Sequence, residues 1–81
     1  MKVIFNNRYD ENIELAEVET SSEGWETIIS FLKEHKYKAP YFRSWAVPEE
    51  RKVIIDCGSY SEFFHFIFDE EGEEAAHEYG M

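Results

Sequence analysis

One stretch of this chain, residues 22–36, spaces its apolar side chains as a helix does, and it is surrounded by strand-like segments. The apolar stripe consists of Trp25, Ile28, Ile29 and Leu32. Intervals of three and four residues place all four side chains on one face of a helix. Thr20, Ser21 and Ser22 can cap the helix at its start, and Pro40 cannot continue it. The stripe therefore predicts a helix that packs its apolar face on a sheet.

Five segments around this helix have the composition of β-strands. They are residues 2–5, 12–19, 41–47, 52–57 and 60–68. Alternation in the second segment slips at Ala16-Glu17, which predicts a β-bulge. The fourth segment is apolar on both faces, which predicts an interior position in the sheet. Gly58-Ser59 predicts a two-residue hairpin turn that would place Val53 opposite Phe64.

These elements predict an α+β fold for residues 1–68. The expected order is ββαβββ, an antiparallel sheet with one helix packed on one face. A chain of 81 residues has no room for a second core. Residues 69–81 are strongly acidic, and we expect them to form a mobile acidic tail, with a frayed helix over residues 73–79 as the alternative.

Charge is the next constraint, because 18 acidic residues against 8 basic ones give a net charge of −10. Residues 53–81 contain no lysine or arginine, whereas residues 27–52 hold six of the eight basic residues. Binding to nucleic acid depends on clusters of lysine and arginine, so we expect no direct contact with nucleic acid. The acidity serves solubility or, in the sharper hypothesis, a basic partner protein.

The acidic side chains most suited to such a partner lie in two segments. They are Glu14, Glu17 and Glu19 in the second strand and Asp69, Glu70 and Glu71 after the last strand. The resulting hypothesis is a non-enzymatic module that docks on a basic surface of a host protein, such as a surface that otherwise binds nucleic acid. A toxin immunity protein is an alternative that differs mainly in its partner.

A second alternative uses aromatic residues, because one helix covers only one face of a five-stranded sheet. The candidate interface consists of Tyr41, Arg43, Trp45, Phe64 and Phe66. Aromatic residues together with arginine are typical of interface centres. This interpretation predicts a small assembly protein that forms a homodimer.

Catalytic and cofactor motifs are missing from the sequence. It contains neither of the usual glycine-rich phosphate-binding motifs. One cysteine, Cys57, cannot form an internal disulfide or a thiolate zinc site. We therefore expect no catalytic residue, cofactor or metal. The lone cysteine, the lack of an apolar run long enough to span a bilayer and the lack of a signal peptide predict a cytoplasmic protein without membrane contact.

Aromatic residues and a Gly-Ser pair are placed in a recurring way in residues 25–33, residues 41–45 and residues 53–64. By this placement the chain resembles small uncharacterised acidic proteins of Gram-positive phages and prophages. The resemblance implies a setting and assigns no role to a residue. Proteins of this class are short acidic gene products that often bind and block a host protein, and nucleic-acid mimics and anti-restriction inhibitors are among them.

Overall fold

The computed structural model describes residues 1–69 and 73–80 of the chain. Its strands are β1 (Lys2–Asn6), β2 (Asn12–Glu17), β3 (Arg43–Val47), β4 (Lys52–Asp56) and β5 (Phe63–Ile67). The helices are α1 (Ser21–Glu34), the single 3-10 turn η1 (Pro48–Glu50) and α2 (Glu73–Glu78). The chain forms one small α+β domain with a five-stranded antiparallel sheet and one main helix. The expected order ββαβββ is only roughly matched, because η1 and α2 are added to it.

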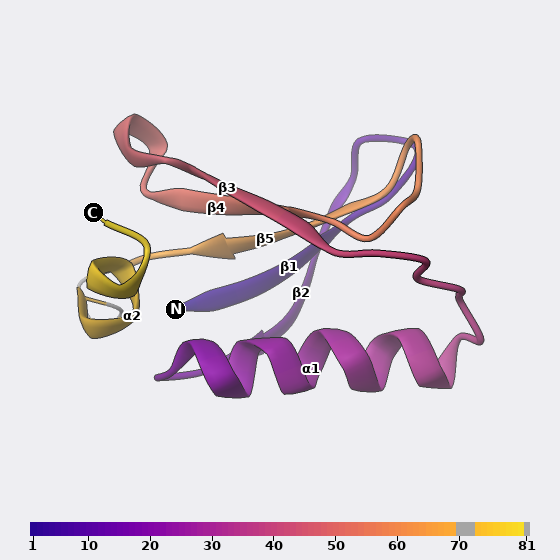
Figure 1. The fold of residues 1–81 in the computed structure, drawn as a ribbon, viewed down its shortest axis with the longest axis horizontal. Coiled ribbons are helices and arrows are strands. Elements are labelled where there is room, and N and C mark those ends of the chain that lie inside the picture. The colour runs from indigo at the N-terminus through magenta and orange to yellow at the C-terminus, as the bar shows by residue number, and fades with distance from the viewer. Residues whose placement is uncertain (70–72, 81) are drawn as a thin grey trace.

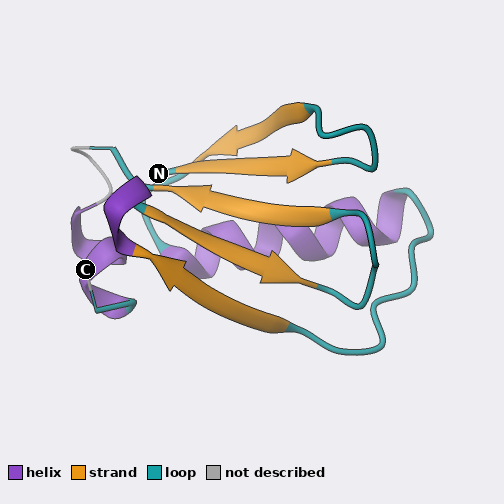
Figure 2. Ribbon diagram, turned by 90° about the horizontal axis from the view of Figure 1, so that it is seen from above, coloured by secondary structure: helices purple, strands orange, loops and turns teal. Residues whose placement is uncertain are grey.

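The sheet has the strand order β2-β1-β5-β4-β3, so β2 and β3 form its two edges (Figure 2). The N-terminal hairpin joins the meander β3-β4-β5 through pairing of β1 with β5, in which Phe5 lies beside Phe64. Helix α1 runs across one face of this sheet (Figure 1). Strand side chains alternate between the two faces, and Val3, Val53 and Phe66 lie fully buried on the face that α1 covers.

The predicted bulge in β2 is confirmed, one residue earlier than expected. Val3 pairs with Ala16 while Ile4 pairs with Glu14, which leaves Leu15 as the extra residue of β2. An extra residue bends the strand and changes which side chains face the core. The bulge therefore explains why the alternation slips in this part of the sequence.

The predicted two-residue turn at Gly58-Ser59 is wrong. Val53 pairs with Phe66 and not with Phe64, so β4 and β5 are joined by a longer loop. Two side chains stabilise this loop: Asp56 Oδ1 accepts from the Gly58 N–H at 2.9 Å, and Ser59 Oγ accepts from the Glu62 N–H at 3.2 Å. The error amounts to two residues, so each side chain stays on its predicted face.

Helix α1 begins and ends with defined caps. Thr20 Oγ1 accepts from the Glu23 N–H at 3.2 Å. At the other end the Tyr37 N–H donates to Leu32 O at 3.0 Å and the Lys36 N–H donates to Lys33 O at 3.2 Å. Lys36 has a φ of 55°, so it occupies the left-handed position of a Schellman motif. The helix therefore ends several residues before Pro40.

The face that α1 buries is not quite the predicted stripe. Ile28 and Leu32 are buried, and Trp25 and Phe31 flank them, but Ile29 is 43% exposed. The buried line runs through residues 24, 28 and 32, about a third of a turn away from Ile29. The prediction that Ile29 packs on the sheet is therefore wrong.

Gly24 is buried where α1 packs against Phe66 of the sheet. A Cβ atom at this position would lie 2.9 Å from the Phe66 ring and 2.8 Å from Met1 Cε. We expect Gly24→Ala to lower the free energy of unfolding by up to about 2 kcal/mol, because an overpacking cost of about 1–3 kcal/mol outweighs the gain of about 1 kcal/mol from helix propensity. Urea denaturation measures the change. A more stable variant would show that the helix can move off the sheet freely.

The expected acidic tail contains a packed helix in the part that the structure describes. Ala76 of α2 is 1% exposed. The Tyr79 hydroxyl accepts a hydrogen bond from the Trp25 indole N–H at 3.1 Å, and its ring lies 6.0 Å from that of Phe68. The Ser21 hydroxyl also donates to the Glu78 carboxylate. These contacts hold α2 at the start of α1, and α2 corresponds to the alternative expectation of a helix over residues 73–79.

Candidate protein-binding surfaces

A groove runs along the surface between α1 and β2. It has a volume of about 470 Å³. Its lining residues are Leu15, Val18, Glu23, Glu26, Thr27, Ser30, Phe31 and Glu34. The groove exists because α1 buries its residues 24, 28 and 32, which turns the neighbouring side of the helix toward β2. Apolar side chains of β2, the segment after it and the helix contribute part of its surface.

The charged side chains that line this groove are all acidic. Three carboxylates, those of Glu23, Glu26 and Glu34, come from one side of α1. None of the described residues that line the groove is a lysine, arginine or histidine. A groove with carboxylates and apolar side chains is suited to a segment that is itself basic and apolar. These three glutamates were not among the predicted site residues, although their spacing along the helix indicates a shared face.

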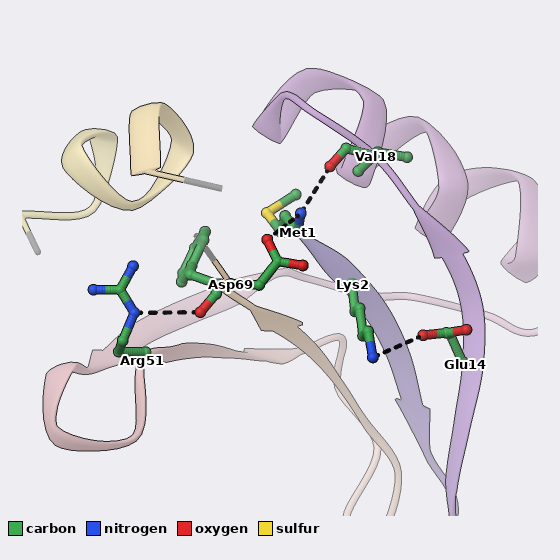
Figure 3. A network of polar contacts seen from close by, with 7 residues as sticks. Met1, Lys2, Glu14, Val18, Arg51 and Asp69 are labelled. Atoms are coloured by element: carbon green, nitrogen blue, oxygen red, sulfur yellow. Dashed lines mark hydrogen bonds and ion pairs between the residues drawn. The ribbon is translucent and has the colours of Figure 1, made fainter. Parts of the chain in front are cut away.

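None of the predicted partner-binding acidic residues that the structure describes lines this groove. Glu14 and Glu17 lie on β2 opposite Ile4 and Lys2, on the sheet face away from α1. Glu14 forms an ion pair with Lys2, with 3.7 Å between Lys2 Nζ and Glu14 Oε1 (Figure 3). Glu19 is exposed in the segment between β2 and α1.

Asp69 lies beside the amino group of Met1, close to the end of β2. The Met1 nitrogen donates to Val18 O at 3.0 Å and to Asp69 Oδ1 at 3.3 Å (Figure 3). The Met1 amino group therefore connects Asp69 to Val18, the residue that follows β2. Glu70 and Glu71 lie outside the described residues.

The predicted aromatic interface does not form one surface. Phe64 and Phe66 are 1% and 0% exposed and lie under α1. Trp45 pairs with Ile54, which pairs with His65, so Trp45 lies on the opposite face from Phe64. Successive strand residues point to opposite faces, which explains the separation. Tyr41, Arg43 and Trp45 remain together, and the Arg43 guanidinium lies 5.2 Å from the centre of the Tyr41 ring.

The face of the sheet away from α1 carries partly buried apolar side chains. Ile4, Ile54 and His65 form a row across its middle strands, and all three side chains are partly buried. Burial lowers the pKa of His65, and the nearby charge of Lys52 lowers it further. His65 is therefore favoured in its neutral form on this face.

Arg43 of β3 and Asp56 of β4 form a short ion pair. Arg43 Nη2 lies 2.7 Å from Asp56 Oδ2, and Asp56 is 4% exposed. The hydrogen bond from Arg43, followed by that from the Gly58 N–H, lowers the pKa of Asp56 against the opposing effect of burial. The pair connects β3, β4 and the loop that follows β4.

This lowered pKa predicts a loss of stability in acid. The carboxylate contributes in full above the pKa of an unfolded aspartate, about 3.9, and the contribution disappears as pH falls through the lower folded value. We expect urea denaturation of the protein to show a steep decline below about pH 4 that is weaker in Asp56→Asn. Asp10→Asn, the same change at an exposed site, is the control. Equal acid dependence in both variants would contradict the assignment.

Cys57 is 6% exposed, and burial followed by the charge of Asp56 raises the pKa of its thiol. Within residues 1–69 and 73–80, no three His, Cys, Asp or Glu side chains gather in a way that could hold a metal ion. None of the helices in this part of the chain combines the length and the apolar character needed to cross a membrane.

Comparison of the chain with protein-family models, with curated proteins and with solved structures found no match. The charge and shape of the surface therefore carry the functional argument.

Proposed function

We propose that this protein is a non-enzymatic, acidic protein-binding module that docks on a basic surface of a partner protein. The observation that carries the proposal is the groove between α1 and β2, with three carboxylates and no basic side chain among its lining residues. The partner surface is of the kind that otherwise binds nucleic acid. The resemblance to phage proteins suggests an inhibitor of a host protein as the biological setting.

Long-range attraction and short-range contacts contribute separately to such binding. A net charge of −10 accelerates the approach of a basic partner and keeps nucleic acid away. Carboxylates on α1 then select lysine and arginine side chains, while Leu15, Val18 and Phe31 offer apolar contact. The matching segment is amphipathic, with basic residues flanking a short apolar stripe.

A peptide probe of defined composition tests this proposal directly. The probe is an amphipathic peptide of leucine and lysine, compared with a peptide of the same pattern in which glutamate replaces lysine. We expect the lysine peptide to shift backbone NMR signals of α1 and β2 selectively, and the glutamate peptide to leave them unchanged. Raising salt from low to physiological concentration should weaken the binding, because exposed charges are screened beyond about 8–10 Å.

A pair of charge variants separates the groove from general acidity. The groove variant is Glu23→Gln/Glu26→Gln/Glu34→Gln, and the control variant is Glu11→Gln/Glu49→Gln/Glu62→Gln. Both variants lose the same charge, but we expect the groove variant to raise Kd about tenfold, since each exposed pair contributes about 0.2–1 kcal/mol. The control should change Kd much less. Equal weakening in both variants, or signal shifts spread over the whole surface, would overturn the groove as the binding site.

A further inference from the structure

Strand β2 is an edge of the sheet that borders the acidic groove. Among the described strands, β1 alone pairs with it, so no described strand covers its outer side (Figure 2). None of its six residues is fully buried. Ile13 is 46% exposed, and Leu15 lines the groove beside α1. A strand edge next to apolar side chains is suited to accepting an extended peptide segment as a further strand.

The hydrogen bonds of the N-terminal hairpin show which residues of β2 turn their backbone groups outward. Val18 and Met1 exchange two hydrogen bonds, at 2.8 and 3.0 Å, and the Asn7 N–H donates to Glu11 O at 3.1 Å. Hydrogen-bonded and non-hydrogen-bonded pairs alternate along an antiparallel ladder. Counted from both ends toward the bulge, the residues of β2 that direct their backbone N–H and C=O groups away from β1 are Asn12, Glu14 and Glu17.

Carboxylates lie on both sides of this edge. Glu14 and Glu17 lie on the sheet face away from α1. Lys2 Nζ lies 3.7 Å from Glu14 Oε1, and both side chains are about half exposed, so this ion pair is weak and balances part of the charge. The acidity of the edge therefore rests mainly on Glu17 and, on the α1 side, on the three glutamates of the groove. These groove glutamates are Glu23, Glu26 and Glu34.

We propose that the partner segment binds as an extended basic strand that pairs antiparallel with the outer edge of β2. This inference rests on the proposed function, because the segment occupies the same acidic groove. Residues that exchange hydrogen bonds in an antiparallel pair lie opposite each other on one face, which places a lysine or arginine of the added strand beside Glu17. Alternate residues point toward α1, where apolar side chains contact Ile13 and Leu15 and basic residues at either end reach the groove glutamates.

The same features disfavour other strands at this edge. Bulges and charged side chains are devices by which edge strands avoid pairing with apolar strands and with copies of themselves. If β2 of a second copy paired here, Glu14 and Glu17 of the two copies would lie close together, in chains that each carry a net charge of −10. A basic strand converts this repulsion into attraction.

Two peptides with the same numbers of leucine and lysine residues distinguish a strand from a helix. In the strand peptide leucine occupies every second position, with lysine between and at both ends. In the helix peptide leucine recurs at intervals of three and four residues. We expect calorimetry to show that the strand peptide binds about tenfold more tightly, because it alone gains backbone hydrogen bonds and cross-strand pairs.

The outcomes separate this inference from the proposed function. A helix peptide that binds as tightly as the strand peptide would overturn the strand pairing and leave the groove as the docking site. If neither peptide binds, the proposed function fails together with this inference.

Hydrogen exchange and backbone methylation test the pairing itself. We expect the amides of Glu14 and Glu17 to exchange more slowly in the complex and the amides of β3, at the opposite edge, to be unchanged. Methylation of the backbone nitrogens of the lysines that alternate with leucine should abolish binding, because these amides face β2 in an antiparallel pair, whereas methylation at the leucines should be tolerated. Unprotected Glu14 and Glu17 amides, or a loss of binding on leucine methylation, would overturn the proposal.

A matched pair of variants tests the charge contact. Glu17→Gln should raise the Kd of the strand peptide about threefold, while Glu49→Gln, the same change at an exposed site in η1, should leave it unchanged. Equal Kd values for the two variants would contradict the position of the added strand beside Glu17.

Discussion

Phe66→Ala is expected to remove most of the stability of this fold. Phe66 is 0% exposed on β5, and its ring lies 5.8 Å from that of Trp25 and 6.3 Å from that of Tyr79. It therefore joins the sheet to both α1 and α2. Removal of a buried phenylalanine ring costs about 3–5 kcal/mol, while the lower end of the range for whole domains is about 5 kcal/mol.

Phe42→Ala is the matched control for this experiment. It removes the same atoms from a side chain that is 43% exposed and touches Trp25 from outside the strand. Urea denaturation of the two variants should show a loss for Phe42→Ala that is less than half of the loss for Phe66→Ala. Similar losses would mean that the core is not centred on β5.

A second pair of variants on α1 should differ by a similarly large amount. We expect Leu32→Ala to lower the free energy of unfolding by about 2–5 kcal/mol, because Leu32 is 7% exposed beneath the helix. Ile29→Ala should cost less than about 1 kcal/mol, since Ile29 is 43% exposed. The two substitutions lie on the same helix and each replaces a four-carbon side chain, so helix propensity explains little of the difference.

Denaturation with urea at neutral pH measures both variants, and helix content by circular dichroism shows whether α1 still forms. The sequence alone predicts that both residues pack on the sheet. Equal losses would therefore support the predicted stripe and would contradict the orientation of α1 in the structure.

Residue alternation predicted that Val53 and Phe64 share a face of the sheet, but it did not predict the register of the strands. Val53 lies on the same face as Phe64, yet it pairs with Phe66. The local signal of a glycine followed by serine favours a tight turn. In the structure the side chains of Asp56 and Ser59 satisfy backbone N–H groups of a longer loop, and pairing of β5 with β1 on its other side fixes the same register. Neither contact is visible in a local pattern.

The acidic character of the protein was predictable, but its groove was not. Glu23, Glu26 and Glu34 follow helical spacing, which in sequence is indistinguishable from an ordinary solvated face. The groove depends on where α1 sits above the sheet, and Gly24 and Phe66 fix that position through tertiary contact. The residues predicted to form an aromatic interface do not share one surface, because Phe64 and Trp45 belong to opposite faces of the sheet.

The pairing of β1 with β5 also determines when the sheet can be completed. Lys2 lies beside Ile67, so the interior of the sheet joins segments from nearly opposite ends of the described chain. The β1–β2 hairpin can form early from local contacts, but its inner edge has no partner until β5 is available. Closing so long a loop costs entropy before any contact compensates for it. On the ribosome the inner edge of β1 therefore stays without its partner strand until β5 has been synthesised.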